Sequence, residues 1–145
     1  MTGFVLDDFL PYQLAVLASR TSREFSTIYR ERYGIGVAEW RVVAHLSQTD
    51  EPVSVREICA QVQLEKSKVS RAASRLQARG FLHKVTNEQD RRLVELSLTD
   101  KGRAMIDDLA PVAREFHAEL LKRAGDLGEP FQQGIDRLLE QAPEA

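Results

Sequence analysis

Cationic and hydroxyl side chains gather in one stretch of this 145-residue chain. Between Glu65 and Glu88 lie six Lys or Arg residues, three Ser residues and no acid. Ammonium and guanidinium groups bind phosphate oxygens, and short hydroxyls contact phosphates or base edges without crowding a groove. The stretch therefore indicates a nucleic-acid contact surface, although a charge cluster can also be an ordinary solvated helix face.

The distribution of charge along the whole chain shows the same basic region. Residues 56–103 hold eleven basic and six acidic residues, whereas the rest of the chain holds nine basic and sixteen acidic ones. The net charge of −2 therefore conceals a basic middle inside an acidic chain. A localised basic region of this kind is typical of a nucleic-acid footprint.

Two short amphipathic helices are predicted to position these side chains. Ser54 and Glu57 have the spacing of a capping box, so we expect a helix over 55–62. A second helix is expected over 65–79, with Gly80 as its C-terminal cap. Its apolar stripe comprises Val69, Ala72, Ala73 and Leu76. The pair predicts a helix-turn-helix, whose second helix enters the major groove of DNA.

The predicted DNA contacts of this unit are basic or hydroxyl residues that fall away from the apolar stripe. They are Ser54, Lys66, Ser67, Lys68, Ser70, Arg71, Ser74 and Arg75. An ordinary exposed helix would mix acids among its bases, and none follows Glu65 in this helix. The placement favours DNA contact over a merely solvated face.

After Gly80 the hydrophobic period changes from helical to alternating, which predicts strands near 81–86 and 94–98. The polar tip between them contains Arg91 and Arg92, and such a hairpin after a helix-turn-helix is a wing. A guanidinium at the tip can enter the narrow minor groove, or it can pair with Asp90 or Glu88 to hold the hairpin. We expect one arginine to reach DNA and the other to pair with Asp90, without assigning which.

Long helices are expected on both sides of this lobe, over 10–33, 37–48, 100–124 with a kink at Pro111, and 129–141. The predicted fold class is mainly α with a small β-hairpin wing. We expect an N-terminal dimerisation helix at 1–36, a winged helix-turn-helix at 37–100 and C-terminal dimerisation helices at 101–145. The apolar residues of the two ends, which either cover a second subunit or close onto each other, are Phe4, Val5, Leu6, Phe9, Leu10, Phe131, Ile135, Leu138 and Leu139.

Four segments together resemble the MarR family of bacterial transcription regulators. They are the run Leu64–Arg71, the run Leu76–Phe81, the tip Asp90–Arg92 and the run Leu98–Gly102. The resemblance implies a winged helix-turn-helix homodimer that binds a palindromic operator and is released by a small ligand, often a phenolic or aromatic acid. Gly36 departs from the pattern, because the family usually has a Thr cap there.

A ligand pocket is expected where the first two long helices meet the DNA-binding lobe. Its candidate lining is Phe25, Tyr29, Trp40, Arg41 and His45. Aromatic walls and an arginine suit an aromatic carboxylate. The alternative, that the aromatic residues are simply core, is at least as well supported.

Other functions find little support in the sequence. No nucleophile elbow, phosphate loop or local metal motif is present, so we expect neither an enzyme nor a cofactor. Cys59 is the single cysteine and lies on an apolar stripe, which favours a small core residue over an oxidant-sensing switch. A winged protein-interaction module without DNA binding is the other alternative. No stretch of about 20 apolar residues appears, and we expect a cytoplasmic protein without membrane contact.

Overall fold

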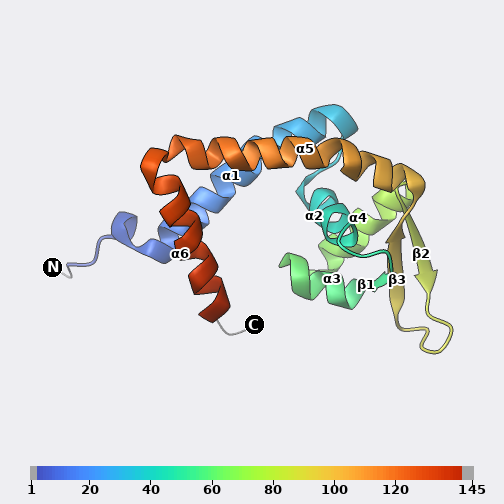
Figure 1. Cartoon of the computed structure of the whole chain (residues 1–145). Helices are drawn as coiled ribbons and strands as arrows, with labels where there is room; N and C mark the ends of the chain where they lie inside the picture. The colour runs from blue at the N-terminus through green and yellow to red at the C-terminus, as the bar shows by residue number, and fades with distance from the viewer. Residues whose placement is uncertain (1–2, 142–145) are drawn as a thin grey trace. The chain divides into compact units, whose positions relative to one another are not determined.

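The computed structural model of the protein describes residues 3–141. The chain forms two compact units, the first ending at Asp107 and the second beginning at Asp108. The α-helices and strands, labelled in Figure 1, are α1 (Leu10–Tyr33), α2 (Val37–Leu46), β1 (Val53–Ser54), α3 (Val55–Val62), α4 (Lys66–Ala78), β2 (Leu82–Thr86), β3 (Val94–Leu98), α5 (Asp100–Arg123) and α6 (Gly128–Gln141). Two short 3₁₀ helices, η1 (Leu6–Asp8) and η2 (Gly125–Leu127), precede α1 and α6.

The predicted fold class is confirmed, because helices dominate and the strands form one small antiparallel sheet. The predicted hairpin is the β2–β3 pair, in which Lys84 lies opposite Leu96. A third strand, β1, was not predicted, and Val53 pairs with Leu96 on the free edge of β3. Two residues are too few to show a period of two, so this strand exists only through its pairing.

Helix ends are set by local chemistry that the sequence already displays. The Ser54 hydroxyl oxygen accepts a hydrogen bond from the Glu57 backbone N–H at 3.1 Å, as the capping box predicts. Gly34 ends α1 with φ of +65°, a left-handed conformation that glycine adopts without strain. Gly80 follows α4 with φ of +82°. The ends of both helices therefore lie close to where the sequence places them.

The N-terminal end of α2 has no side-chain cap. Gly36 precedes α2 and has no hydroxyl to offer, but its N–H donates to a carboxylate oxygen of Glu39 at 3.3 Å. Half of the capping box is therefore present. α2 ends at Leu46, two residues before the predicted end.

The core of the first unit is formed mainly by α2, α3, α4 and the sheet. Among its fully buried side chains are Val42, Val43, Leu46, Ile58, Val69, Leu76 and Leu96. The predicted stripe of α4 is buried along its whole length, with Val69, Ala73 and Leu76 at 0% exposure. The opposite face of α4 is consequently turned outward, and this positions the candidate site.

The second unit holds most of α5, then η2 and α6. α5 runs through Pro111 as one helix, and the predicted kink stays a prediction. Gly128, the first residue of α6, lies so close to Leu121 that a Cβ would sit 2.4 Å from the Leu121 carbonyl oxygen. This close approach allows the tight turn between α5 and α6. No helix in residues 3–141 is long and apolar enough to span a membrane.

Candidate nucleic-acid interface

The outward face of α4 carries the predicted contact residues together. Lys66, Ser67, Lys68, Arg71, Ser74 and Arg75 are all exposed, and Ser70 is half-buried. They occupy the face opposite the buried stripe, as the helical spacing predicts. No acidic residue occurs within α4 itself, so this face presents a positive potential to any polyanion.

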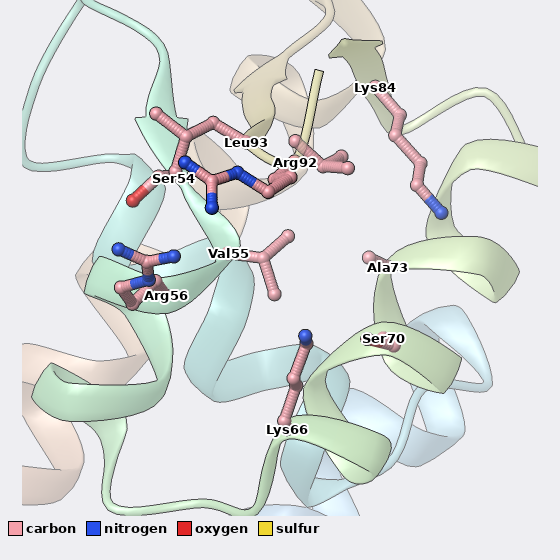
Figure 2. Close-up of a pocket in the computed structure, with 10 residues that line it drawn as sticks. Ser54, Val55, Arg56, Lys66, Ser70, Ala73, Lys84, Arg92 and Leu93 are labelled. Atoms are coloured by element: carbon pink, nitrogen blue, oxygen red, sulfur yellow. The ribbon is translucent and has the colours of Figure 1, made fainter. Parts of the chain in front are cut away.

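A hollow of about 110 Å³ separates α4 from the start of α3 and from the wing (Figure 2). Four cationic side chains line it: Arg56 from α3, Lys66 from α4, Lys84 from β2 and Arg92 from the wing. Ser54 and Ser70 add hydroxyl groups, and no carboxylate lines the hollow. Its charge and hydrogen-bond donors suit a phosphate group.

Arg56 and Lys84 were not among the predicted contacts. Arg56 lies in the first turn of α3, and Lys84 is an exposed residue of β2. Both lie within the basic region 56–103, but each is the single Lys or Arg of its own element, so the spacing along one helix does not assign either to the contact face. They join the other cations only because the sheet packs beside α4 in the folded unit.

Arg75 has a second partner on the protein. Its guanidinium lies 3.4 Å from a carboxylate oxygen of Glu39 on α2, and the Arg75 side chain remains 68% exposed. Glu39 is buried, and it accepts hydrogen bonds from both Arg75 and the Gly36 N–H. Arg75 thus links α4 to α2, and its predicted contact with DNA stays a prediction.

The two arginines of the wing tip have different surroundings. Asp90 accepts hydrogen bonds from the Arg92 side chain, at 3.0 and 3.3 Å, and from the Arg92 backbone N–H at 3.1 Å. These bonds hold the pKa of the Asp90 carboxyl below its usual value. Arg91 is exposed and forms no ion pair with residues 3–141. Arg92 is therefore the arginine that pairs with Asp90.

Asn87 fixes the other side of the tip. Its side-chain oxygen accepts from the backbone N–H groups of Gln89 and Asp90, at 2.8 and 3.1 Å. Its amide nitrogen donates to Glu95 on β3 at 2.9 Å. The tip is a hydrogen-bonded turn, and this turn holds Arg91 at the end of the hairpin.

Three of the five predicted ligand-pocket residues form a packed aromatic cluster, and a ligand pocket at these residues stays a prediction. Phe25, Tyr29 and Trp40 pack on one another with ring centroids 5.2–5.5 Å apart, and Phe25 and Tyr29 are buried. Burial raises the pKa of the Tyr29 hydroxyl, an effect that the nearby charges of Arg30 and Arg41 oppose. This packing agrees with the alternative that the aromatic residues are core. His45 is half-buried on α2.

Arg41 instead faces an open hollow of about 590 Å³ between α1 and α2. Arg23 and Arg30 of α1 also line this hollow, together with three serines and without an acid. Three guanidinium groups around one hollow repel one another unless an anion lies between them. The arginine predicted for a ligand carboxylate therefore has two arginine neighbours that the sequence did not single out.

Two other predicted features have plain surroundings. Cys59 is half-buried on α3, so it is less enclosed than a core residue. Within residues 3–141, no three His, Cys, Asp or Glu side chains come together as metal ligands could.

The helix pair α3–α4, the three-stranded wing beside it and the acid-free basic face define a winged helix-turn-helix protein. Residues 33–93 match the sequence profile of the MarR family. The transcriptional repressor MdtR of Bacillus subtilis (strain 168) is 33% identical over 72 residues, which cover 50% of this chain and 46% of MdtR. This chain therefore spans about half the length of that relative.

Solved structures extend the likeness over nearly the whole chain. A MarR family regulator from Silicibacter pomeroyi DSS-3 is 28% identical with a TM-score of 0.79, over 95% of this chain and 97% of that one. BpsR of Bordetella bronchiseptica, whose DNA binding is regulated by 6-hydroxynicotinic acid, shares the fold at 18% identity and a TM-score of 0.79, over 97% and 99% of the two chains. The chain is thus similar to MarR family regulators in sequence over residues 33–93 and in fold over nearly its whole length. Its relatives regulate transcription and are not enzymes, as predicted here.

Proposed function

We propose that this protein is a DNA-binding regulator of transcription that reads the major groove with α4 and reaches the minor groove with the wing. One observation carries the proposal: the exposed face of α4 bears no acid, and the hollow beside it is lined by Arg56, Lys84 and Arg92 without a carboxylate. Phosphate contacts supply much of the affinity of such proteins, and base contacts from the recognition helix supply the specificity.

The proposed active form is a homodimer. Large apolar side chains stand exposed at the start of the first unit, including Phe4 at 61% and Leu10 at 54%. In the second unit, Leu138 and Leu139 are 53% and 70% exposed. A second copy would remove such surfaces from water. We assign residues 1–36 and 101–145 to dimerisation and 37–100 to DNA binding, with half-sites about 34 Å apart.

We further propose that a small anionic ligand releases the protein from its operator, and that the protein is a repressor. The hollow lined by Arg23, Arg30 and Arg41 supports a carboxylate ligand better than the packed aromatic cluster does. The regulation of BpsR by an aromatic acid and the naming of MdtR as a repressor are consistent with this proposal. A chromosomal target also agrees with the predicted cytoplasmic location.

The decisive experiment is selection of duplexes from a random pool, followed by titration of the selected duplex at several salt concentrations. We expect log K to fall linearly with log salt. If Arg71 and Arg91 each contact one phosphate, replacement of either one alone by Ala lowers the magnitude of the slope by about 1.8, because the dimer loses two contacts of about 0.9 each. Arg137→Ala, at an exposed arginine of α6, is the control, and it leaves the slope unchanged provided that gel filtration shows the variant to be a dimer like the wild type. Failure to enrich any duplex at low salt would contradict the proposal.

A further inference from the structure

One basic residue near the recognition helix is directed away from the proposed DNA surface. Arg79 caps the C-terminal end of α4. Its guanidinium donates to the Gly34 carbonyl oxygen at 3.3 Å and to the neighbouring Tyr33 carbonyl oxygen. These carbonyls belong to the end of α1, where helical hydrogen-bond partners have run out. Arg79 therefore ties the end of one helix to the end of another, 45 residues apart in sequence.

A second set of contacts holds the same end of α4 to the start of α5. The Lys101 ammonium group donates to the Arg79 carbonyl oxygen at 2.6 Å. The ammonium nitrogen and the Arg79 guanidinium carbon lie 4.5 and 5.2 Å from the ring centroid of Phe81. Phe81 is only 3% exposed, and the Tyr33 ring meets it edge-on at 6.4 Å. One buried ring thus anchors cations from two elements.

This junction lies at the end of α4 opposite the end that meets base edges. α4 has 13 residues, which corresponds to about 20 Å at 1.5 Å per residue. A tilt of about 5° at the junction would then move the N-terminal end by roughly 1.7 Å. Hydrogen bonds to bases tolerate only a few tenths of an ångström before they weaken. A small rotation of α4 at the junction therefore displaces Lys66 and Ser67 by a distance that matters for hydrogen bonds to bases.

We infer that Arg79 is a positioning residue for DNA recognition, which sets the orientation of α4 by clamping it to α1 and does not itself contact DNA. The inference rests on the proposed function. It also explains the choice of arginine, since a planar guanidinium can donate to two carbonyl oxygens at once while lysine offers a single point charge. The Arg79 guanidinium therefore acts through the geometry of its hydrogen bonds to the α1 carbonyls and not through attraction of phosphates.

The test is Arg79→Lys, which keeps the charge and loses the two-pronged contact. On the duplex selected by the wild-type protein, we expect about tenfold weaker binding, or 1.4 kcal/mol. We expect an unchanged salt slope and a smaller preference for the selected duplex over a scrambled one. Arg71→Ala is the contrast, because a lost phosphate contact lowers the slope. Hydrogen exchange without DNA should show faster exchange in the last turns of α1 and α4 of Arg79→Lys.

Gly34 allows the clamp to be loosened from its other side. Gly34→Ala places a side chain in a left-handed conformation, which strains the carbonyls that Arg79 holds, whereas Gly34→Asn tolerates that conformation. We expect Gly34→Ala to reproduce the weaker binding at unchanged slope and Gly34→Asn to stay near wild type. These two variants decide the question by the same titration if Arg79→Lys does not fold.

Several results would overturn the inference. Wild-type affinity and discrimination in Arg79→Lys would do so, and so would a salt slope that falls in Arg79→Lys or in Gly34→Ala. If the wild-type protein binds no duplex, the proposed function fails. In that case unchanged exchange in α1 and α4 of Arg79→Lys would separately remove the clamp.

Discussion

Gly102→Ala is expected to destabilise the protein, although alanine is the better helix former. Gly102 lies in the first turn of α5, where its N–H donates to the Thr99 hydroxyl at 3.1 Å. A Cβ at this position would lie 2.1 Å from the Phe81 carbonyl oxygen and 3.0 Å from a methyl carbon of Leu98. Ordinary van der Waals contact begins at 3.4 Å, so the Phe81 carbonyl and the helix must separate by about 1.3 Å.

The size of the effect follows from what this separation disturbs. Overpacking a rigid site costs about 1–3 kcal/mol. The Phe81 carbonyl oxygen also accepts the Thr99 N–H at 3.1 Å, and loss of that bond adds about 1 kcal/mol. The gain in helix propensity offsets up to about 1 kcal/mol. We therefore expect the free energy of unfolding to fall by about 2 kcal/mol.

The assay is urea unfolding followed by far-UV circular dichroism, at one fixed protein concentration because a dimer would make stability concentration-dependent. Ala104→Gly, at an exposed position of the same helix, measures the propensity difference without a clash and should cost about 1 kcal/mol. Propensity alone would make Gly102→Ala stabilising by a similar amount. A midpoint at or above that of the wild type would refute the steric reasoning.

Three further outcomes test the local chemistry. Gly36→Ser should stabilise the protein by a few tenths of a kcal/mol, because the hydroxyl completes the cap of α2 in open space, and thermal unfolding would show no rise if this is wrong. The Asp90 carboxyl should titrate below its ordinary value of 3.8 in an NMR pH series, so the stabilisation it gives the wing is present above that value and is lost as the pH falls through the lowered pKa. Arg92→Gln should bring the midpoint back up, and an unmoved midpoint would exclude Arg92 as the cause. Leu76→Ala should cost about 2–5 kcal/mol in urea unfolding, against less than about 0.5 for the exposed Gln77→Ala, and equal effects would contradict the burial of Leu76.

Helices and their ends could be predicted because the interactions that set them are local. The Ser54 cap bonds a residue three positions away, and the buried stripe of α4 repeats at helical spacing. The strand β1 could not be predicted, since its two residues pair with a strand some 40 positions later. Sequence patterns report neighbours along the chain, and strand pairing at this distance is decided by tertiary packing.

The candidate site divides in the same way. The exposed face of α4 follows from periodicity, so its cations and serines could be named in advance. Arg56 and Lys84 could not, because only the packing of α3, α4 and β2 brings them to one hollow. The aromatic pocket stays a prediction for a related reason. Phe25 and Tyr29 lie one helical turn apart, but whether Trp40 fills the space between the helices depends on side-chain volumes that sequence spacing does not report.

Nearly every residue of the run Leu98–Gly102, which is part of the family resemblance, has its own structural role. Leu98 is buried at the end of β3, and the Thr99 hydroxyl both donates to the Gly80 carbonyl and accepts the Gly102 N–H. Lys101 holds the Arg79 carbonyl, and Gly102 leaves room for the Phe81 backbone. Apart from the Gly102–Thr99 hydrogen bond, which lies within the start of α5, the contacts of Thr99, Lys101 and Gly102 join the start of α5 to the end of α4 or to the residues just after it. The run Leu98–Gly102 therefore holds the start of α5 against the C-terminal end of α4. We expect substitutions in this run to alter DNA recognition, although none of its residues is predicted to contact DNA.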